Sequence, residues 1–169
     1  MISRKIEQEL ERFYKSKRNY ALLIDGARQV GKTFIIESFG QSHYESFIKI
    51  DFIRTPDAHK IFNNVENEAD VLTRLSALSD KPLIKGHTLI FFDEIQKCPE
   101  VVTYVKYLVQ EGSYRYILSG SLLGVELKGI RSVPVGFMDE VKMFPLDLEE
   151  FVCSLGDYSG LLAETRKAW

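Results

Sequence analysis

The sequence has few of the residues that mark several protein classes. Its only two cysteines, Cys98 and Cys153, form no CxxC pair and lie at no cysteine–histidine spacing typical of zinc. We therefore expect neither a zinc site nor a disulfide scaffold, and a reducing, cytoplasmic environment is the default expectation. The longest apolar runs are a few residues, too short for a membrane-spanning helix, and residues 1–18 lack the apolar core of a secretory signal. We expect no association with a membrane.

An excess of charge of one sign is also missing. The chain has 22 Lys and Arg against 24 Asp and Glu, a net charge of -2. No bulk positive field is available to attract nucleic acid, so a nucleic-acid partner stays open but gains no support from charge. With 45% hydrophobic and 27% charged residues, the composition excludes global disorder, and 169 residues suit one domain with a sizeable core.

Short apolar runs alternate with helical patterns along the chain. The runs predict five strands, at 20–24, 47–52, 88–92, 114–118 and 140–144. Between them, apolar spacing predicts helices over 2–17, 32–39 (ended by Gly40), from Thr55-Pro56 onward, over 71–78, and from Pro99 to Gly112. This alternation predicts an α/β fold of three layers, αβα, with a parallel sheet covered on both faces and an N-terminal helix.

The strongest motif is Gly26-Ala-Arg-Gln-Val-Gly31-Lys32-Thr33, which fits GxxxxGK[ST] between a predicted strand and a predicted helix. Glycines let consecutive N–H groups turn inward around phosphates, and the helix adds the positive end of its dipole. Lys32 supplies a mobile charge for the β- and γ-phosphates, and Thr33 offers a hydroxyl to Mg²⁺. The predicted nucleotide-binding residues are Gly26, Ala27, Arg28, Gln29, Val30, Gly31, Lys32, Thr33 and Phe34. For Arg28, contact with phosphate and contact with solvent are equally good interpretations.

Two acids end the apolar run 88–92, at what would be the ligand-binding edge of an open parallel sheet. Adjacent side chains there point in different directions and can do different jobs. We predict that Asp93 holds Mg²⁺ and that Glu94 orients or activates the attacking water. Ser119 follows the next predicted strand and is a further catalytic candidate, through a contact with the γ-phosphate or that water; Ser121 is a weaker one.

The base is inferred by elimination. No NKxD or TKxD stretch is present, which disfavours a guanine-binding GTPase, and the glycines do not form the GxGxxG of dinucleotide-binding loops. ATP with Mg²⁺ is therefore the predicted ligand.

We expect residues 19–145 to form the nucleotide-binding core. We expect residues 146–169 to form a helical extension, opened by a capping-box-like pair, Asp147 and Glu150, and carrying an apolar stripe to Trp169. Such a stripe predicts the truncated start of a missing second domain, or a bound partner.

With these residues in view, the chain resembles a branch of bacterial and archaeal AAA-superfamily ATPases in which the ATPase domain precedes a C-terminal domain of uncharacterised function. The similar stretches are 26–33 (GARQVGKT), 88–96 (TLIFFDEIQ), 102–110, 120–127 (GSLLGVEL) and 144–151 (FPLDLEEF). The resemblance implies a P-loop fold with strand order 5-1-4-3-2, ATP hydrolysis assisted by Ser119, and the missing domain or a homo-oligomer as partner. Relatives usually carry Arg or Lys near 134–137, where this chain has Phe137, which leaves Arg131 as a weak candidate for an arginine finger.

Three functions follow as hypotheses. The first is a Mg²⁺-dependent ATPase module that drives a conformational change in an attached or associated domain, with weak turnover alone because nothing evident covers the adenine. The second is a nucleotide-gated binding module with little or no turnover. The third is a small-molecule kinase, which would need an arginine-rich lid, whereas residues 99–145 contain only Arg115 and Arg131.

Overall fold

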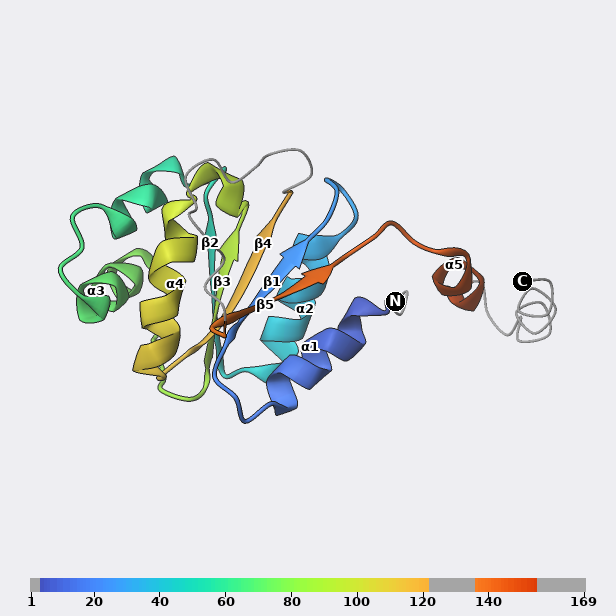
Figure 1. Ribbon diagram of the computed structural model, residues 1–169, viewed down its shortest axis with the longest axis horizontal. Coiled ribbons are helices and arrows are strands. Elements are labelled where there is room, and N and C mark those ends of the chain that lie inside the picture. Colours follow the sequence, from blue (N-terminus) through green and yellow to red (C-terminus); the bar gives the residue numbers. More distant parts are fainter. Residues whose placement is uncertain (1–3, 122–135, 155–169) are drawn as a thin grey trace.

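A computed structural model describes residues 4–121 and 136–154, which form a central sheet flanked by helices (Figure 1). The elements run in the order α1 Ile6–Lys15, β1 Ala21–Asp25, α2 Lys32–His43, β2 Ser46–Asp51, η1 Pro56–Phe62, α3 Glu68–Leu78, β3 Thr88–Asp93, η2 Ile95–Lys97, α4 Glu100–Glu111, β4 Arg115–Gly120, β5 Met138–Lys142 and α5 Leu148–Ser154. None of the helices in this part of the chain is long and apolar enough to cross a membrane.

The five strands form one sheet in the order β2-β3-β4-β1-β5, and every neighbouring pair is parallel. This arrangement confirms the predicted α/β class and the order 5-1-4-3-2. The continuous apolar runs have a simple cause, because β1 and β3 are buried along their whole length. Because all strands point the same way, the residues that follow β1, β3 and β4 meet at one edge of the sheet.

Helices cover both faces, so the three predicted layers are present (Figure 1). On one face, α1 and α2 pack through Leu10, Phe13 and Ile36 against strand residues such as Leu22 and Phe91. The opposite face carries η1, α3 and α4, whose buried side chains include Ile61, Leu75 and Val105, against Leu23 and Phe92. Helices that share an apolar face with the sheet in this way fix the two loops that follow β1 and β3.

Arg115 fixes the carboxyl end of the N-terminal helix. Its guanidinium donates hydrogen bonds to the backbone oxygens of Phe13 and, at 3.0 Å, of Arg18, and it lies 4.2 Å from the centroid of the Phe13 ring. A cation at a helix carboxyl end satisfies carbonyl groups that have no partner within the helix. Arg115 is therefore committed to holding α1 in place, which removes one of the two arginines that a kinase lid would have needed.

Some local predictions were wrong, and for Gly40 the reason is tertiary. Gly40 lies inside α2, which continues to His43, and a Cβ at Gly40 would come within 2.2 Å of the Phe47 ring. Glycine is needed there for close packing and not as a stop. The predicted helix start at Thr55-Pro56 is confirmed, with Pro56 in the first turn, but the segment is a 3-10 helix and Thr55 makes no side-chain cap. The last strand begins at Met138, and Ser119 lies within β4.

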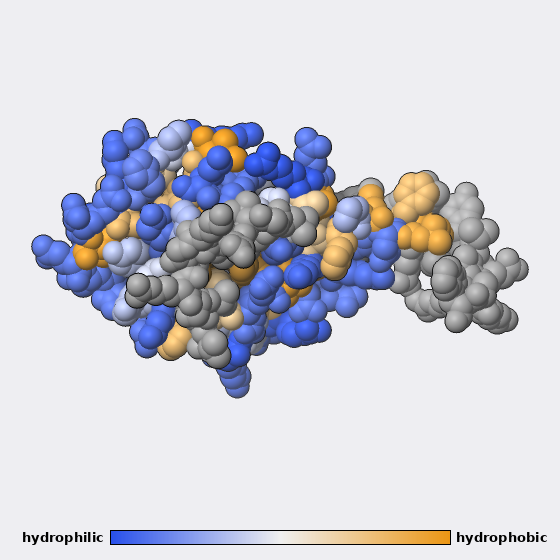
Figure 2. Space-filling view, turned by 45° about the horizontal axis from the view of Figure 1, so that its top comes forward, coloured by the Kyte–Doolittle hydropathy of each residue, from blue (hydrophilic) through white to orange (hydrophobic). Residues whose placement is uncertain are grey.

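The capping pair before α5 forms as predicted. Glu150 N donates to Asp147 Oδ1 at 2.8 Å, and Asp147 N donates to Glu150 Oε2 at 3.1 Å. Helix α5 stands beside the body of the domain, and Figure 2 shows apolar side chains gathered where the chain leaves the body to reach it. Exposed large apolar residues of this stretch are Phe144, Leu146, Leu148 and Phe151. The predicted stripe beyond 154 lies outside the described residues.

Candidate nucleotide-binding site

The loop between β1 and α2 has the backbone of a phosphate-binding loop. Gln29 (φ 65°) and Gly31 (φ 95°) both adopt positive φ, the left-handed region that turns successive N–H groups inward. Gly26 has a different requirement, because a Cβ there would lie 2.2 Å from the carbonyl oxygen of Met143, in the segment after β5. Both motif glycines are therefore fixed by geometry, one by backbone conformation and the other by close packing.

Lys32 opens α2 and turns back over this loop. Its side chain is largely buried, and Nζ donates to the carbonyl oxygens of Gly26 and Ala27, at 2.7 Å each. Burial lowers the pKa of Lys32, and the negative charges of Glu94, Asp25 and Asp93 partly oppose that shift. The ammonium group thus lies inside the loop, where its partners are two neutral carbonyl groups that an anion can replace.

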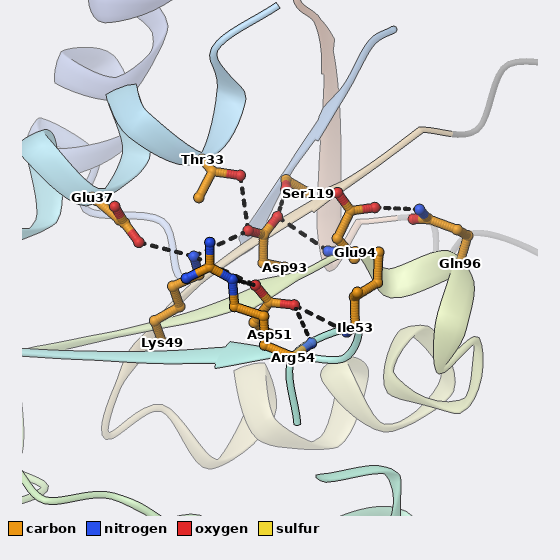
Figure 3. Close-up of polar contacts among 10 residues, drawn as sticks. All are labelled: Thr33, Glu37, Lys49, Asp51, Ile53, Arg54, Asp93, Glu94, Gln96 and Ser119. Carbon is orange, nitrogen blue, oxygen red and sulfur yellow. Dashed lines mark hydrogen bonds and ion pairs between the residues drawn. The ribbon is translucent and has the colours of Figure 1, made fainter. Parts of the chain in front are cut away.

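Asp93 joins the loop to the acidic strand end. Its Oδ2 accepts a hydrogen bond from Thr33 Oγ1 at 2.8 Å, and its Oδ1 accepts one from Ser119 Oγ at 2.5 Å (Figure 3). Asp93 and Ser119 are buried, so the carboxylate is held from both sides. The structure therefore brings together three predicted residues from β3, β4 and the start of α2. The predicted contact of Ser119 with phosphate or water stays a prediction, and its bond to Asp93 is an addition.

Glu94 points away from Asp93, as expected for adjacent acids at a strand end. Its backbone is left-handed (φ 59°), and its carboxylate accepts a hydrogen bond from the Gln96 amide on η2 (Figure 3). The Gln96 side-chain oxygen, Oε1, in turn accepts a hydrogen bond from Ser121 N, just after β4, at 3.4 Å. Gln96 thereby fixes the direction of Glu94, a role that sequence reasoning missed.

Lys49 is a second residue that sequence reasoning missed. It lies on β2, two residues before Asp51, which pairs in register with Asp93. Lys49 Nζ is 3.4 Å from Asp93 Oδ2, 2.9 Å from Glu37 Oε1 and 3.7 Å from Asp51 Oδ2 (Figure 3). Burial acts to lower the pKa of Lys49, but the bond to Glu37 and the charges of Asp93 and Asp51 outweigh it, so the pKa is raised. A lysine inside an apolar strand, which needs a carboxylate partner, was the available sequence signal.

The oxygen atoms of Thr33 and Asp93 suit Mg²⁺. This ion prefers oxygen ligands and usually takes only one or two from the protein, with phosphate and water completing its octahedron. Within residues 4–121 and 136–154, no group of three or more His, Cys, Asp or Glu side chains is placed to hold a metal ion by itself. The donor set therefore fits a metal that arrives with a phosphate ligand and not a permanent protein-bound one.

The remaining predicted residues surround this centre. Arg28 and Gln29 are exposed at the tip of the loop, Ala27 and Val30 are partly buried, and Arg131 lies outside the described residues. Phe34, 63% exposed, borders a groove of about 570 Å³ that runs from Gly31 and Met143 along the line between α1 and α2. The groove is mostly apolar and begins beside Gly31 of the phosphate loop. That position is suitable for a flat, weakly polar group attached to the phosphates.

Comparison with known proteins agrees with this geometry. A family model described as AAA domain matches residues 18–152, most of the chain. A search of curated proteins found no match to the chain. The matched range includes the phosphate loop, the acidic strand end and Ser119, and the parallel sheet has the order that the family resemblance implied. The chain therefore belongs to the AAA domain family of P-loop NTPase-like, nucleotide-binding modules.

Proposed function

We propose that this protein binds ATP together with Mg²⁺ and hydrolyses it. The observation that carries the proposal is the 2.8 Å hydrogen bond from Thr33 Oγ1 to Asp93 Oδ2. It joins two motifs that lie about sixty positions apart in the chain, at the edge of the sheet where such folds bind ligands. Either motif alone has ordinary structural explanations, whereas their meeting supports a metal–triphosphate site.

The loop residues would bind the phosphates. Lys32 Nζ exchanges its bonds with the Gly26 and Ala27 carbonyls for the β- and γ-phosphates, and the loop N–H groups with the amino end of α2 complete the cradle. Thr33 and Asp93 would hold Mg²⁺, which supplies charge neutralisation at the phosphate oxygens. Asp93 keeps its direction through Ser119, so the carboxylate needs little reorganisation when ligands arrive.

Glu94 is the proposed catalytic base. Its carboxylate is near the phosphate loop but makes its described hydrogen bond with Gln96 and none with Thr33 or Lys32, so it is free to orient a water molecule against the γ-phosphate. In phosphoryl transfer most of the work is positioning, and a carboxylate aligned by an amide neighbour fits that need. The apolar groove beside Phe34 would take the base, which is consistent with adenine.

At the level of the whole protein we propose a module that couples nucleotide state to a conformational change in an attached or associated partner. We also propose that it belongs to the AAA branch in which a C-terminal domain follows the ATPase domain. The exposed apolar residues on α5, Leu148 and Phe151, support a partner at this end. A homo-oligomer and a cytoplasmic location belong to the same proposal. A nucleic-acid partner has no support from the near-neutral charge.

Phosphate release at saturating Mg-ATP tests the enzyme. We expect slow but measurable turnover in the wild type. In Glu94→Gln, turnover should fall by about 100-fold or more, the effect of removing a general base, while ATP binding stays unchanged. Glu66→Gln, an exposed acid away from the site, is the matched control and should behave as wild type. Equal turnover of wild type and Glu94→Gln would reject the role of Glu94.

One observation favours the second candidate, a nucleotide-gated binding module. The hydrogen bond from Gln96 can hold the Glu94 carboxylate away from a water molecule. The same assay separates the two functions, because tight binding of Mg-ATP without phosphate release would support the gated module. Gln96→Ala adds a test: turnover should fall if Gln96 aligns the Glu94 carboxylate for catalysis, and should rise if Gln96 holds that carboxylate away from the water molecule.

A further inference from the structure

Arg4, just before α1, connects two segments that are far apart in the sequence. One guanidinium nitrogen donates to the carbonyl oxygen of Val30 in the phosphate loop at 3.1 Å, and the other donates to the carbonyl oxygen of Phe144 at 2.7 Å. Its Nε lies 3.3 Å from Glu150 Oε1 on α5. The side chain is only 13% exposed, and it also borders the groove beside Phe34. The same nitrogen that reaches Val30 lies beside Gly31.

Glu150 is the anchor of this connection on α5. Its Oε1 also accepts a hydrogen bond from Lys5 N at 2.8 Å, and its Oε2 accepts one from Asp147 N. Burial acts to raise the pKa of Glu150, but the bonds from Lys5, Asp147 and Arg4 outweigh it and the pKa is lowered. Arg4 and Glu150 form a close ion pair but not a hydrogen bond, because Arg4 Nε has no hydrogen-bond partner among the described residues. Glu150 therefore stays ionised and holds the start of α1 against α5.

The contacts of Lys32 within the phosphate loop must change when a nucleotide binds. Lys32 Nζ has three N–H donors and gives two of them to the Gly26 and Ala27 carbonyls here, so it cannot keep both bonds while donating to both the β- and the γ-phosphate. The Val30 carbonyl belongs to the same short loop, one residue from Gly31 and two from Lys32, so rearrangement of the loop changes the partner that Arg4 contacts. A ligand shifts a conformation only through such contacts that differ between two states.

We propose that Arg4 is a positioning residue that couples the phosphate loop to α5, so that nucleotide binding changes how firmly α5 is held. The proposal rests on nucleotide binding at the phosphate loop, as proposed above, and adds the route by which it reaches the carboxyl-terminal part. Coupling between two sites is reciprocal, so a change at Glu150 must alter nucleotide affinity although Glu150 makes no described contact with the loop.

The test compares wild type with Arg4→Gln, Glu150→Gln and the double variant, and uses Arg12→Gln as control. Arg12 lies on α1, the helix that Arg4 precedes, is exposed, and pairs only with Glu9 among the described residues. Affinity is measured with Mg²⁺ and a non-hydrolysable ATP analogue, and hydrogen exchange of the α5 amides is measured with and without it. Because the Arg4 contact differs between the free and the bound loop, we expect nucleotide affinity to change about ten-fold in Arg4→Gln, the size expected for a charge-assisted hydrogen bond, and by a smaller factor in Glu150→Gln. The double variant should change less than the product of the two factors.

Hydrogen exchange gives the readout that a purely structural role would not change. The analogue should alter α5 exchange in wild type and in Arg12→Gln, and this response should disappear in Arg4→Gln and Glu150→Gln. If Arg4→Gln does not fold, Glu150→Gln alone decides through its affinity and its exchange response. A wild type that binds the analogue with no change in α5, or a Glu150→Gln variant with wild-type affinity and response, would overturn the coupling alone. A wild type that binds no nucleotide would overturn the proposed function, and the coupling with it.

Discussion

Replacement of Lys32 by methionine should separate ligand binding from stability. Lys32 is 8% exposed and donates two hydrogen bonds at 2.7 Å to backbone carbonyls. Hydrogen bonds from a charged group contribute about 1.5–3 kcal/mol each, so their loss costs about 3–6 kcal/mol. Removing a buried ammonium also removes a desolvation penalty of several kcal/mol, which the lowered pKa of Lys32 reflects. Because methionine keeps the apolar stem, the two effects nearly cancel, and Tm should change by less than about 5 °C.

The effect on ATP binding should be much larger. A unit charge about 4 Å from a phosphate charge, at an effective dielectric constant of about 20, contributes about 4 kcal/mol. Allowing for water that takes the place of the amine, Mg-ATP affinity should fall between about 100-fold and 1,000-fold. Calorimetric titration and a thermal melt measure both quantities. Lys85→Met, exposed before β3 at the other end of the sheet, is the control. An ATP affinity within three-fold of wild type would refute the phosphate role of Lys32. A fall of 15 °C in Tm would refute the expectation that the lost hydrogen bonds and the removed desolvation penalty nearly cancel.

Three further predictions concern other parts of the structure. Lys49→Met removes a cation 3.4 Å from Asp93 Oδ2, so half-maximal Mg²⁺ for ATP binding should fall on the order of ten-fold; no change, or a rise, contradicts competition at Asp93, and Lys60→Met is the control. Gly40→Ala forces a Cβ against the Phe47 ring and should cost about 1–3 kcal/mol in a denaturant titration, while exposed Gln41→Ala should cost under 0.5 kcal/mol; equal stability of the two would exclude tight packing at Gly40. Burial, helped by Glu100, raises the pKa of Cys98 to about 12, so its thiol should resist iodoacetamide at pH 8 until the protein unfolds, as peptide mass spectrometry will reveal; labelling of the native thiol contradicts this.

Much of the fold was predictable because local pattern and tertiary environment agree. The strands β1 and β3 are buried on both faces, and such strands are apolar without alternation, so their sequence is distinctive. The phosphate loop was equally clear, because positive φ at Gly31 and the requirement for a cation and a hydroxyl leave little freedom in sequence. The capping pair Asp147 and Glu150 was predictable for the same reason, since its partners are three residues apart.

The sequence-based predictions failed where a residue's role depends on a neighbour that is distant in the sequence. Gly40 is a helix stop by local rules, yet the ring of Phe47 on β2 requires glycine within α2. Lys49 was overlooked because a single lysine in an apolar strand has no partner visible in the sequence. Its partners Glu37 and Asp93 come from a helix and from the neighbouring strand.

The sequence by itself determined the alternation of strands and helices and the chemistry of the phosphate loop, since each depends on neighbours within a few positions. That alternation in turn predicted a parallel sheet. Only the tertiary structure decided that Asp93 lies between Thr33 and Ser119 and that Gln96 holds Glu94. It also decided that Arg4 links the loop to α5. The physical reason is that hydrogen bonds and ion pairs between distant segments depend on strand order and helix placement, which the burial of the whole core fixes together.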